Sequence, residues 1–300
     1  MQKKISIFLI GRQAIFAVIT LLPLLHISGC SRPPPPASSF AAQPTVASLS
    51  PAATDLIIGI GAANHLLAVS DYDESRPGTV GLPKVGNWNQ IDWEKLAVIS
   101  PKILVTQFGN RMPPDVLPQC KSLGIQVIDV RLDNLSDIYH QADVLGKALG
   151  EQPIEKANVR KMQDGLAAIA KSVAGLPKIR TAIAVFDDGR IGLIGPNRFH
   201  DDLLTIAGGI NVADKFHNPF IDVDGEQLTA LAPDVILDLQ PIPPTTPQEI
   251  QQDQRFWKTL PDVPAVKNGR VFRITAPYAM RPGWHAVQLT ETFAQKLHGK

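Results

Sequence analysis

The sequence predicts an α/β protein in which two Rossmann-like lobes are joined by one long α-helix, with a ligand cleft between the lobes. The first observation is a repeat, in which "IDWEKLAVISPKILV" from Ile91 matches "VDGEQLTALAPDVIL" from Val223. Each copy predicts an aspartate N-cap, a short helix, a proline that ends the helix and a buried strand. The copies begin 132 residues apart, which indicates a duplicated lobe and not a short solenoid repeat.

The second observation is that strands and helices alternate in both halves of the chain. The segments "TVASLSPAATDLIIGIGA" and "GLIGPNRFHDDLLTIAGG" each predict a strand, a turn with proline, a helix and a pair of glycines. The segments "KSLGIQVIDV" and "AVKNGRVFRI" each run through a glycine turn into a strand. Strands that alternate with helices predict parallel sheets covered on both faces.

The third observation is one long helical pattern between the two halves. The segment "PIEKANVRKMQDGLAAIAKSVAGL" begins with Pro153 at a helix start and ends with Gly175 at a C-cap position. We therefore expect an N-terminal lobe at 45–151, an interlobe helix at 152–176 and a C-terminal lobe at 177–300. A cleft between lobes is a favoured ligand site, and a single connecting helix predicts small closure motions.

The N-terminus has the features of an export signal. Basic residues precede an apolar run at 14–25, which is too short to span a bilayer comfortably and leads into "HISGC". This ending resembles the lipobox of bacterial lipoproteins, in which the signal peptide is removed and the cysteine carries a diacylglycerol. The resemblance implies a signal peptide at 1–29 and lipidation of Cys30. The alternative is an uncleaved anchor with an incidental cysteine.

A proline-rich spacer follows this cysteine. The stretch "SRPPPPASSFAAQP" contains nothing that would pack in a core, and at roughly 3 Å per residue it would hold a domain about 40 Å from a membrane. Residues 30–44 are therefore expected to be a lipidated cysteine and its tether. The expected location is the periplasm or cell envelope, with the protein lipid-anchored to a membrane after export.

Composition excludes one class of partner. The chain is 44% hydrophobic and 19% charged, as in a globular protein, and its net charge is +1. Residues 1–29 contain Lys3, Lys4 and Arg12 and no acidic residue, so the rest of the chain is close to neutral. A chain without a basic surplus has no electrostatic footprint for nucleic acid.

The chain has two cysteines, so lipidation of Cys30 would exclude an internal disulfide. The surroundings of Cys120, "LPQCKSLGIQV", predict a small apolar residue that packs on a helix, and we assign it no further role.

From about Val46 to its end, the chain resembles the substrate-binding proteins of ABC importers for iron–siderophores, haem and cobalamin, whose lobes are joined by a single helix. The segments that carry the resemblance are "SLSPAATDLIIGIGA", "LPKVGNWNQIDWEKLAVISPKILV", "IAGGINVAD" and "AVKNGRVFRI", in that order and spacing. Within the family, "VGNWNQ" and the tyrosine in "AVSDYDE" bring the chain closest to the cobalamin-binding member.

The resemblance implies a monomeric extracytoplasmic receptor that captures a metal chelate and delivers it to a permease dimer with its ATPase subunits. Cobalamin or another corrinoid is the first choice of chelate, and an iron–siderophore or haem is the second. The chelate is cargo, so no resident cofactor is implied. An alternative is a chelate-binding sensory or surface-display module without a transport role.

Glu94 and Glu226 occupy equivalent places in the two copies of the repeat. In the family that the chain resembles, one carboxylate on each lobe docks into arginines of the permease dimer. The residues alone also indicate a twofold partner, because a pseudo-twofold protein with one acid per lobe is suited to meet one. The alternative is that each glutamate only stabilises the positive end of its helix.

Two aromatic residues of the N-terminal lobe are candidates for ligand contact. Trp88 lies in a loop between Asn87 and Asn89, where a large apolar ring is costly to leave in water without a partner. The alternative is packing between this loop and the lobe, which is the use expected of Trp93. Tyr72 follows the predicted strand "LLAVS", and ligands of open α/β sheets bind at the carboxyl ends of strands.

The C-terminal lobe supplies the other candidates for ligand contact. The resemblance implies ligand contact for Phe220, because it lies six residues before Glu226 and so matches an aromatic ligand position of that family. Tyr278, Arg281 and Trp284 lie in "APYAMRPGWH", after the last predicted strand. Arg281 would donate hydrogen bonds to a carboxylate, amide or phosphate of the ligand. The alternative for this cluster is decoration of a proline-bounded surface loop.

A large flat ligand between aromatic planes would suit a corrin, a porphyrin or a catecholate siderophore. Haem would call for a tyrosine or histidine ligand, but His200, His217 and His285 are singly placed and expected to be solvated. Arg111 and Arg198 are weaker candidates for ligand contact, with surface charge as the simpler interpretation. The sequence has no HxH, HExxH or CxxC motif, so no metal site is predicted.

Catalysis has little support in the sequence. It contains no G-x-S-x-G elbow, no Walker loop and no recognisable pair of catalytic carboxylates. We therefore expect a binding protein and not an enzyme, and assign no catalytic residue. A diverged periplasmic enzyme is the third alternative.

Overall fold

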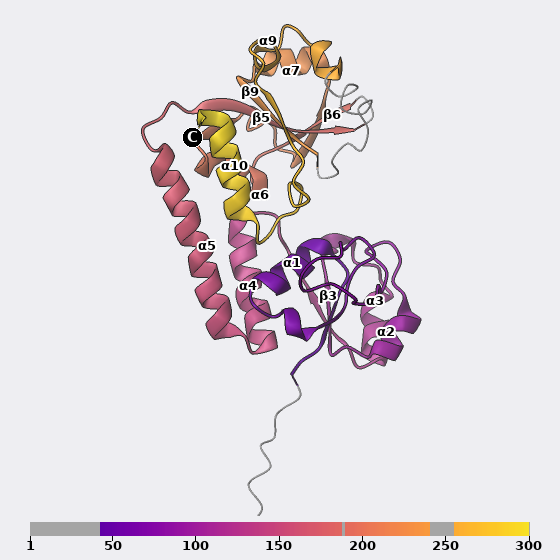
Figure 1. Ribbon diagram of the computed structural model, residues 1–300. Helices are drawn as coiled ribbons and strands as arrows, with labels where there is room; N and C mark the ends of the chain where they lie inside the picture. The colour runs from indigo at the N-terminus through magenta and orange to yellow at the C-terminus, as the bar shows by residue number, and fades with distance from the viewer. Residues whose placement is uncertain (1–42, 188–189, 241–254, 300) are drawn as a thin grey trace, which may run out of the picture. The chain divides into compact units, whose positions relative to one another are not determined.

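The computed structural model describes residues 43–187, 190–240 and 255–299, which belong to one compact unit (Figure 1). The predicted signal peptide, Cys30 and nearly all of the tether lie outside the described residues.

The N-terminal lobe is built on a four-stranded parallel sheet with the order β2-β1-β3-β4. The two central strands, β1 and β3, are buried along their whole length, as expected for parallel strands with helices on both faces. The strands are β1 (Val46–Ser48), β2 (Leu66–Ala68), β3 (Ile103–Thr106) and β4 (Gln126–Asp129). The helices are α1 (Pro51–Gly59), α2 (Trp93–Ile99), α3 (Val116–Ser122) and α4 (Leu135–Leu149), with 3₁₀ turns at Ala63–His65 and Gly109–Arg111.

The C-terminal lobe has a six-stranded sheet with the order β10-β9-β5-β6-β8, and β7 pairs with β5 beside this path. The strands are β5 (Ile179–Asp187), β6 (Arg190–Ile194), β7 (Gly209–Asn211), β8 (Phe220–Val223), β9 (Val235–Leu239) and β10 (Val271–Ile274). The helices are α6 (Phe199–Ile206), α7 (Gly225–Leu231), α9 (Pro264–Lys267) and α10 (Ala286–His298).

The prediction of a parallel sheet is wrong for part of this lobe. Strands β7, β9 and β10 run parallel to their neighbours, whereas β6 is antiparallel to both β5 and β8. The physical reason is the connection between β5 and β6. Only two residues separate them, which allows a hairpin but not the crossover that two parallel strands require.

The predicted long helix is present as α5 (Gln152–Val173), 22 residues or about 33 Å in length. Pro153 lies in its first turn and Gly175, with φ of 84°, follows its end, as the capping pattern predicts. Its buried face packs against α4 of one lobe and α10 of the other, so this helix joins the two lobes (Figure 1). That face is formed mainly by Met162, Leu166, Ile169 and Val173.

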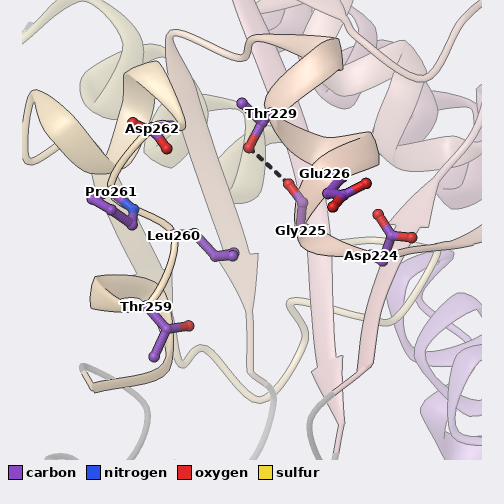
Figure 2. A pocket seen from close by; sticks show the side chains of 8 residues that line it. All are labelled: Asp224, Gly225, Glu226, Thr229, Thr259, Leu260, Pro261 and Asp262. Carbon is purple, nitrogen blue, oxygen red and sulfur yellow. Dashed lines mark hydrogen bonds between the residues drawn. The ribbon is translucent and has the colours of Figure 1, made fainter.

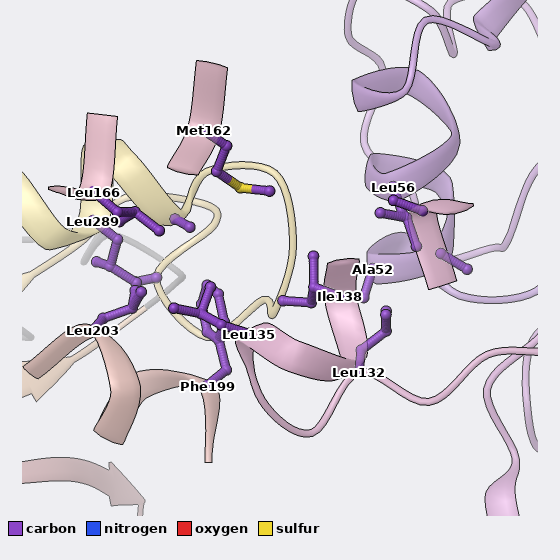
Figure 3. Close-up of a cluster of buried hydrophobic side chains, with 14 of the residues drawn as sticks. Ala52, Leu56, Leu132, Leu135, Ile138, Met162, Leu166, Phe199, Leu203 and Leu289 are labelled. Carbon is purple, nitrogen blue, oxygen red and sulfur yellow. The ribbon is translucent and has the colours of Figure 1, made fainter. Parts of the chain in front are cut away.

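The largest hydrophobic core runs through both lobes. Figure 3 shows its members from α1, α4, α5, α6 and α10, among them Leu56, Ile138, Leu166, Leu203 and Leu289. Two smaller clusters fill the other faces of the sheets. One joins β3 to α2 and α3 and includes the buried Cys120, as predicted, with Trp93 packed against it. The other joins β5 and β9 to α7 and α9.

The two copies of the repeat form helices with the same design. Asp92 and Asp224 cap α2 and α7, accepting hydrogen bonds from the amides of the third helical residue at 3.0 and 2.8 Å. Each helix has seven residues and ends at a non-glycine residue with positive φ, Ser100 at 51° and Ala232 at 47°. This left-handed C-cap, which the sequence did not reveal, turns the chain into the proline and the next strand.

Candidate functional site

Two predicted ligand residues, Tyr72 and Trp88, lie on adjacent loops of the N-terminal lobe. Their side chains are 56% and 55% exposed. Asp71 joins the loops, because its amide donates to Gly86 O at 2.8 Å and its carboxylate accepts from Gly86 N and Asn87 Nδ2, both at 3.3 Å. The structure therefore brings the two segments that carry these rings together.

The backbone around Trp88 is held by short-range contacts. Asn87 Oδ1 accepts hydrogen bonds from the amides of Asn89 at 2.8 Å and Gln90 at 3.2 Å. Gly86 has φ of 95°, and a Cβ there would lie 2.2 Å from Gln90 O, so only glycine fits this turn. The loop thus presents an exposed indole on a fixed backbone.

Phe220, the predicted ligand residue of the C-terminal lobe, is the first residue of β8 and is 55% exposed. The guanidinium carbon of Arg198 lies 5.6 Å from the centroid of its ring. Arg198 also pairs with Asp133 of the N-terminal lobe at 2.8 Å. The interpretation of Arg198 as a surface charge is therefore wrong, because its side chain is three-quarters buried and contacts both Asp133 and the ring of Phe220. Arg111, by contrast, is exposed, in line with the surface-charge interpretation.

Arg281 reaches from the C-terminal lobe to two acids of the N-terminal lobe. Its Nη1 and Nη2 donate to Asp55 at 2.9 Å and Glu74 at 3.1 Å, and its side chain is 13% exposed. The other oxygen of Asp55 accepts from Arg76 at 2.7 Å. Arg281 thus lies between the lobes, and two of its donor groups are used within the protein.

The buried carboxylate of Asp73 is connected to this ion-pair network through Arg76. Asp73 accepts hydrogen bonds from Thr54 Oγ1 at 2.9 Å, from the amide of Ser70 at 3.1 Å and from Arg76 Nη2 at 3.2 Å. Burial nevertheless raises the pKa of Asp73 above its ordinary value.

Sequence reasoning predicted Arg281 but missed its acidic partners and Arg76. The signal was present in "PAATDLIIGIG", where Asp55 interrupts an otherwise apolar helix. A carboxylate in such a place is buried only when it has partners. Its main interlobe partner, however, lies 226 residues away in the sequence.

The other two aromatic candidates, Tyr278 and Trp284, pack against the protein. The ring of Tyr278 stacks on that of His285, with centroids 4.3 Å apart and an interplanar angle of 16°. Trp284 packs on α1, where a Cβ on Gly59 would lie 2.0 Å from its ring. Both side chains are partly buried against the core that runs through both lobes. They therefore contribute to the contact between lobes, and Tyr72, Trp88 and Phe220 are the exposed rings of the predicted set.

The expectation that the three histidines are solvated is wrong for His200. This ring is buried, and its Nε2 donates to Ala279 O at 2.7 Å. Burial lowers the pKa of His200 to about 4, partly offset by that hydrogen bond, so the ring is neutral near pH 7. His285 is half-buried, and burial lowers its pKa as well, whereas His217 is exposed.

A hollow of about 370 Å³ lies between the lobes. Ser50 and Gln107, which hydrogen-bond at 2.6 Å, lie on the side of the N-terminal lobe, and Met280 and Arg281 lie on the side of the C-terminal lobe. Its lining residues are Ser50, Pro51, Ala52, Glu74, Gln107, Pro277, Met280, Arg281 and Pro282.

The predicted docking residues, Glu94 and Glu226, are exposed at the second position of α2 and α7. Each lines a hollow of about 510 Å³ on its own lobe. Figure 2 shows the one at Glu226, which also contains Asp224 and Asp262 and, among the residues that the structure describes, has no basic residue in its lining. The hollow at Glu94 contains Lys95, which pairs with Asp92 at 2.9 Å. Both surfaces are suited to a cationic partner.

In the part of the chain that the structure describes, no group of three or more His, Cys, Asp or Glu side chains is arranged to hold a metal ion. Among the same residues, no helix combines the length and the apolar character needed to cross a bilayer.

Proteins of known sequence and structure resemble this chain along most of its length. The vitamin B12-binding protein of Vibrio vulnificus (strain CMCP6) is 26% identical over 238 residues, which cover 79% of this chain and 84% of the relative. The crystal structure of the periplasmic vitamin B12 binding protein BtuF of Vibrio cholerae matches with a TM-score of 0.69 at 21% identity, over 85% of this chain and 96% of that one.

An ABC transporter substrate-binding protein from Listeria monocytogenes EGD-e matches with a TM-score of 0.72 at 16% identity, over 86% of this chain and all of that one. At these identities the two structures establish the fold. The family model described as "Periplasmic binding protein" matches residues 46–278, which span both lobes and the helix between them. The chain therefore belongs to the periplasmic binding protein family.

Proposed function

We propose that the protein is the periplasmic substrate-binding component of an ABC importer and that its cargo is cobalamin or a related corrinoid. The observation that carries the proposal is the set of exposed rings, Tyr72 and Trp88 on the N-terminal lobe and Phe220 on the C-terminal lobe. Each ring is more than half exposed. An aromatic ring that remains exposed offers a face on which a ligand can stack.

A planar macrocycle has the shape and chemistry for these rings. Its faces stack on aromatic side chains, while its edge carries polar groups that a protein can recognise by hydrogen bonds. Ser50 and Gln107, at the hollow between the lobes, offer such polar groups. The vitamin B12-binding relative supports cobalamin as the first choice among planar chelates.

Delivery to the membrane is assigned to Glu94 and Glu226. Two helices of equal length, with the same aspartate cap and the same left-handed end, present the two carboxylates. A permease dimer with twofold symmetry would meet one carboxylate with each subunit, through an arginine. In this proposal the chain makes and breaks no bond, and ATPase subunits of the importer supply the energy.

The same proposal includes a lipid anchor at Cys30, with the proline-rich stretch as its tether. Its support is the basic and apolar N-terminus followed by "HISGC". Mass spectrometry of the protein purified from membranes checks it, because a lipidated N-terminal cysteine has a defined mass increment. A mature chain that retains residues 1–29 would contradict the anchor and leave the binding function standing.

The ligand is tested by calorimetric titration of the protein with cyanocobalamin, a ferric catecholate siderophore and haemin. We expect saturable binding of cyanocobalamin, weakened at least about tenfold in Trp88→Ala through loss of one stacking surface. Trp93→Phe is the matched control, because Trp93 packs within the lobe, and it should bind as the parent protein does. Binding of a ferric siderophore or haemin alone would overturn the choice of cargo.

The transport role is tested by reversing both docking charges, Glu94→Lys with Glu226→Lys. Uptake of cobalamin into cells should fall strongly while the affinity for cobalamin stays unchanged, because in this proposal the two carboxylates contact the permease and not the cargo. Unchanged uptake would exclude the docking assignment and favour a sensory or display module that binds the chelate without delivering it.

A further inference from the structure

The guanidinium of Arg198 lies over the exposed ring of Phe220, with its carbon 5.6 Å from the ring centroid. This distance falls within the range in which the positive charge and the electron-rich face of a ring attract one another. Arg198 can restrain the ring of Phe220 only if its own side chain is held in place.

Arg198 is held from the other lobe. Its Nη1 donates to Asp133 Oδ1 at 2.8 Å, and the second oxygen of Asp133 accepts from Arg131 Nε at 2.6 Å. The backbone of Asp133 is fixed at the same point, since its carbonyl accepts from the amide of Phe199 at 2.6 Å. Although partial burial raises the pKa of Asp133, the hydrogen bond from Arg131 and the charge of Arg198 leave it below its ordinary value.

The backbone on the C-terminal lobe is equally constrained. Phe220 pairs with Ile194 in the ladder between β8 and β6, and the amide of Gly195 donates to Pro219 O at 2.9 Å. A Cβ on Gly195 would lie 2.1 Å from a carbonyl of the facing segment, so glycine allows this close approach. The turn ends at Asn197, with φ of 60°, directly before Arg198.

We propose that Arg198 is a positioning residue, which, clamped by Asp133, holds the exposed ring of Phe220 in one orientation for stacking on the ligand. The inference rests on the proposed function and adds a residue to it that does not itself touch the cargo. An exposed phenylalanine without such a neighbour would sample several rotamers and lose this freedom when it binds. A ring held in advance avoids that loss.

The first test needs no ligand. In the unliganded protein, ¹³C relaxation of the phenylalanine rings is compared between the parent and Arg198→Gln, with the Phe220 signal assigned by its loss in Phe220→Leu. We expect the order parameter of the Phe220 ring to fall in Arg198→Gln and in Asp133→Asn. Arg131→Gln is the matched control, because it removes a different ion pair of the same aspartate and should leave the ring ordered. An equally ordered ring in Arg198→Gln would overturn the proposal whatever the cargo is.

The second test is a double-mutant cycle on the affinity for cyanocobalamin. Arg198→Gln should weaken binding about 3- to 10-fold in the parent and less than about twofold in the Phe220→Leu background. Equal losses in both backgrounds would show that Arg198 acts on its own and would overturn the positioning role. An unchanged affinity in Phe220→Leu would also overturn it while leaving the binding function intact. Absence of binding by the parent protein would defeat the proposed cargo alone, because the ring measurement stands apart from it.

Discussion

Arg281 and Asp55, 226 residues apart in the sequence, form an ion pair of 2.9 Å between the lobes. Asp55 is almost completely buried and shares its second oxygen with Arg76. Such a carboxylate is stable in the folded state only while its cationic partners remain. The contact between the loop after β10 and helix α1 is therefore an electrostatic link as well as an apolar one.

We expect Arg281→Ala to lower the free energy of unfolding by about 2–3 kcal/mol, because it removes one of two cations from a buried carboxylate. Chemical denaturation at neutral pH measures this change. Arg160→Ala is the matched control, since Arg160 pairs with Asp164 on the exposed face of α5 at 3.6 Å. It should cost less than about 0.5 kcal/mol. Equal effects of the two substitutions would contradict a special role for the interlobe pair.

The left-handed C-cap of α7 predicts opposite effects for two neighbouring substitutions. Ala232→Gly should stabilise the protein by about 0.5–1 kcal/mol, because glycine adopts φ of 47° without strain. Ala230→Gly, at an exposed position in the last turn of the same helix, should destabilise it by about 0.5–1 kcal/mol. Urea denaturation of both variants checks the pair, and a loss of stability in Ala232→Gly would show that the strain is absent.

The buried His200 predicts a loss of stability in acid. Its pKa is about 4 in the folded protein, against an ordinary value of 6.5, so the unfolded chain binds the proton more tightly between these values. The contribution of His200 is full above pH 6.5 and decreases by roughly 3 kcal/mol as the pH falls to 4.

The measurement is the unfolding free energy at several pH values between 7 and 4. His200→Gln should weaken this dependence on pH, because glutamine can still donate to Ala279 O but does not titrate in this range. His217→Gln changes an exposed ring and should follow the parent curve. An identical slope in all three proteins would refute the assignment to His200.

The loop that carries Trp88 predicts a variant with a selective effect on binding. Asn87→Ala removes the acceptor of two backbone amides and so loosens the loop. We expect affinity for cyanocobalamin to fall about 3- to 10-fold and the unfolding free energy to fall by no more than about 1 kcal/mol. Asn64→Ala removes an exposed side-chain hydrogen bond far from Trp88 in the sequence, and it is the control for a nonspecific loss of affinity. Equal affinities of Asn87→Ala and the parent protein for cyanocobalamin would mean that Asn87 does not hold the loop.

Local patterns predicted the elements whose signals lie close together in the sequence. The aspartate caps, the prolines and the spacing of Leu96 and Leu228 placed α2 and α7, and Pro153 with Gly175 placed α5. The exposure of Trp88 followed from its polar neighbours for the same reason.

Features that depend on distant residues escaped prediction. The hairpin of β5 and β6 was missed although its signal is local, since the pair Asp188-Gly189 between the two strands is typical of a two-residue hairpin connection. The partners of Arg281 could not be inferred, since their proximity exists only after both lobes have formed. Trp284 illustrates the same limit, because nothing near it in the sequence indicates that its ring packs on Gly59.

The core that runs from α1 through α4 and α5 to α10 has a consequence for cooperativity. A lobe separated from its neighbour would expose apolar side chains such as Leu56 on one side or Leu289 on the other, at about 25 cal/mol for each Å² brought into water. Neither half is then a stable folding unit. Thermal unfolding should proceed as a single transition, and partial melting of one lobe with the other intact should not be populated.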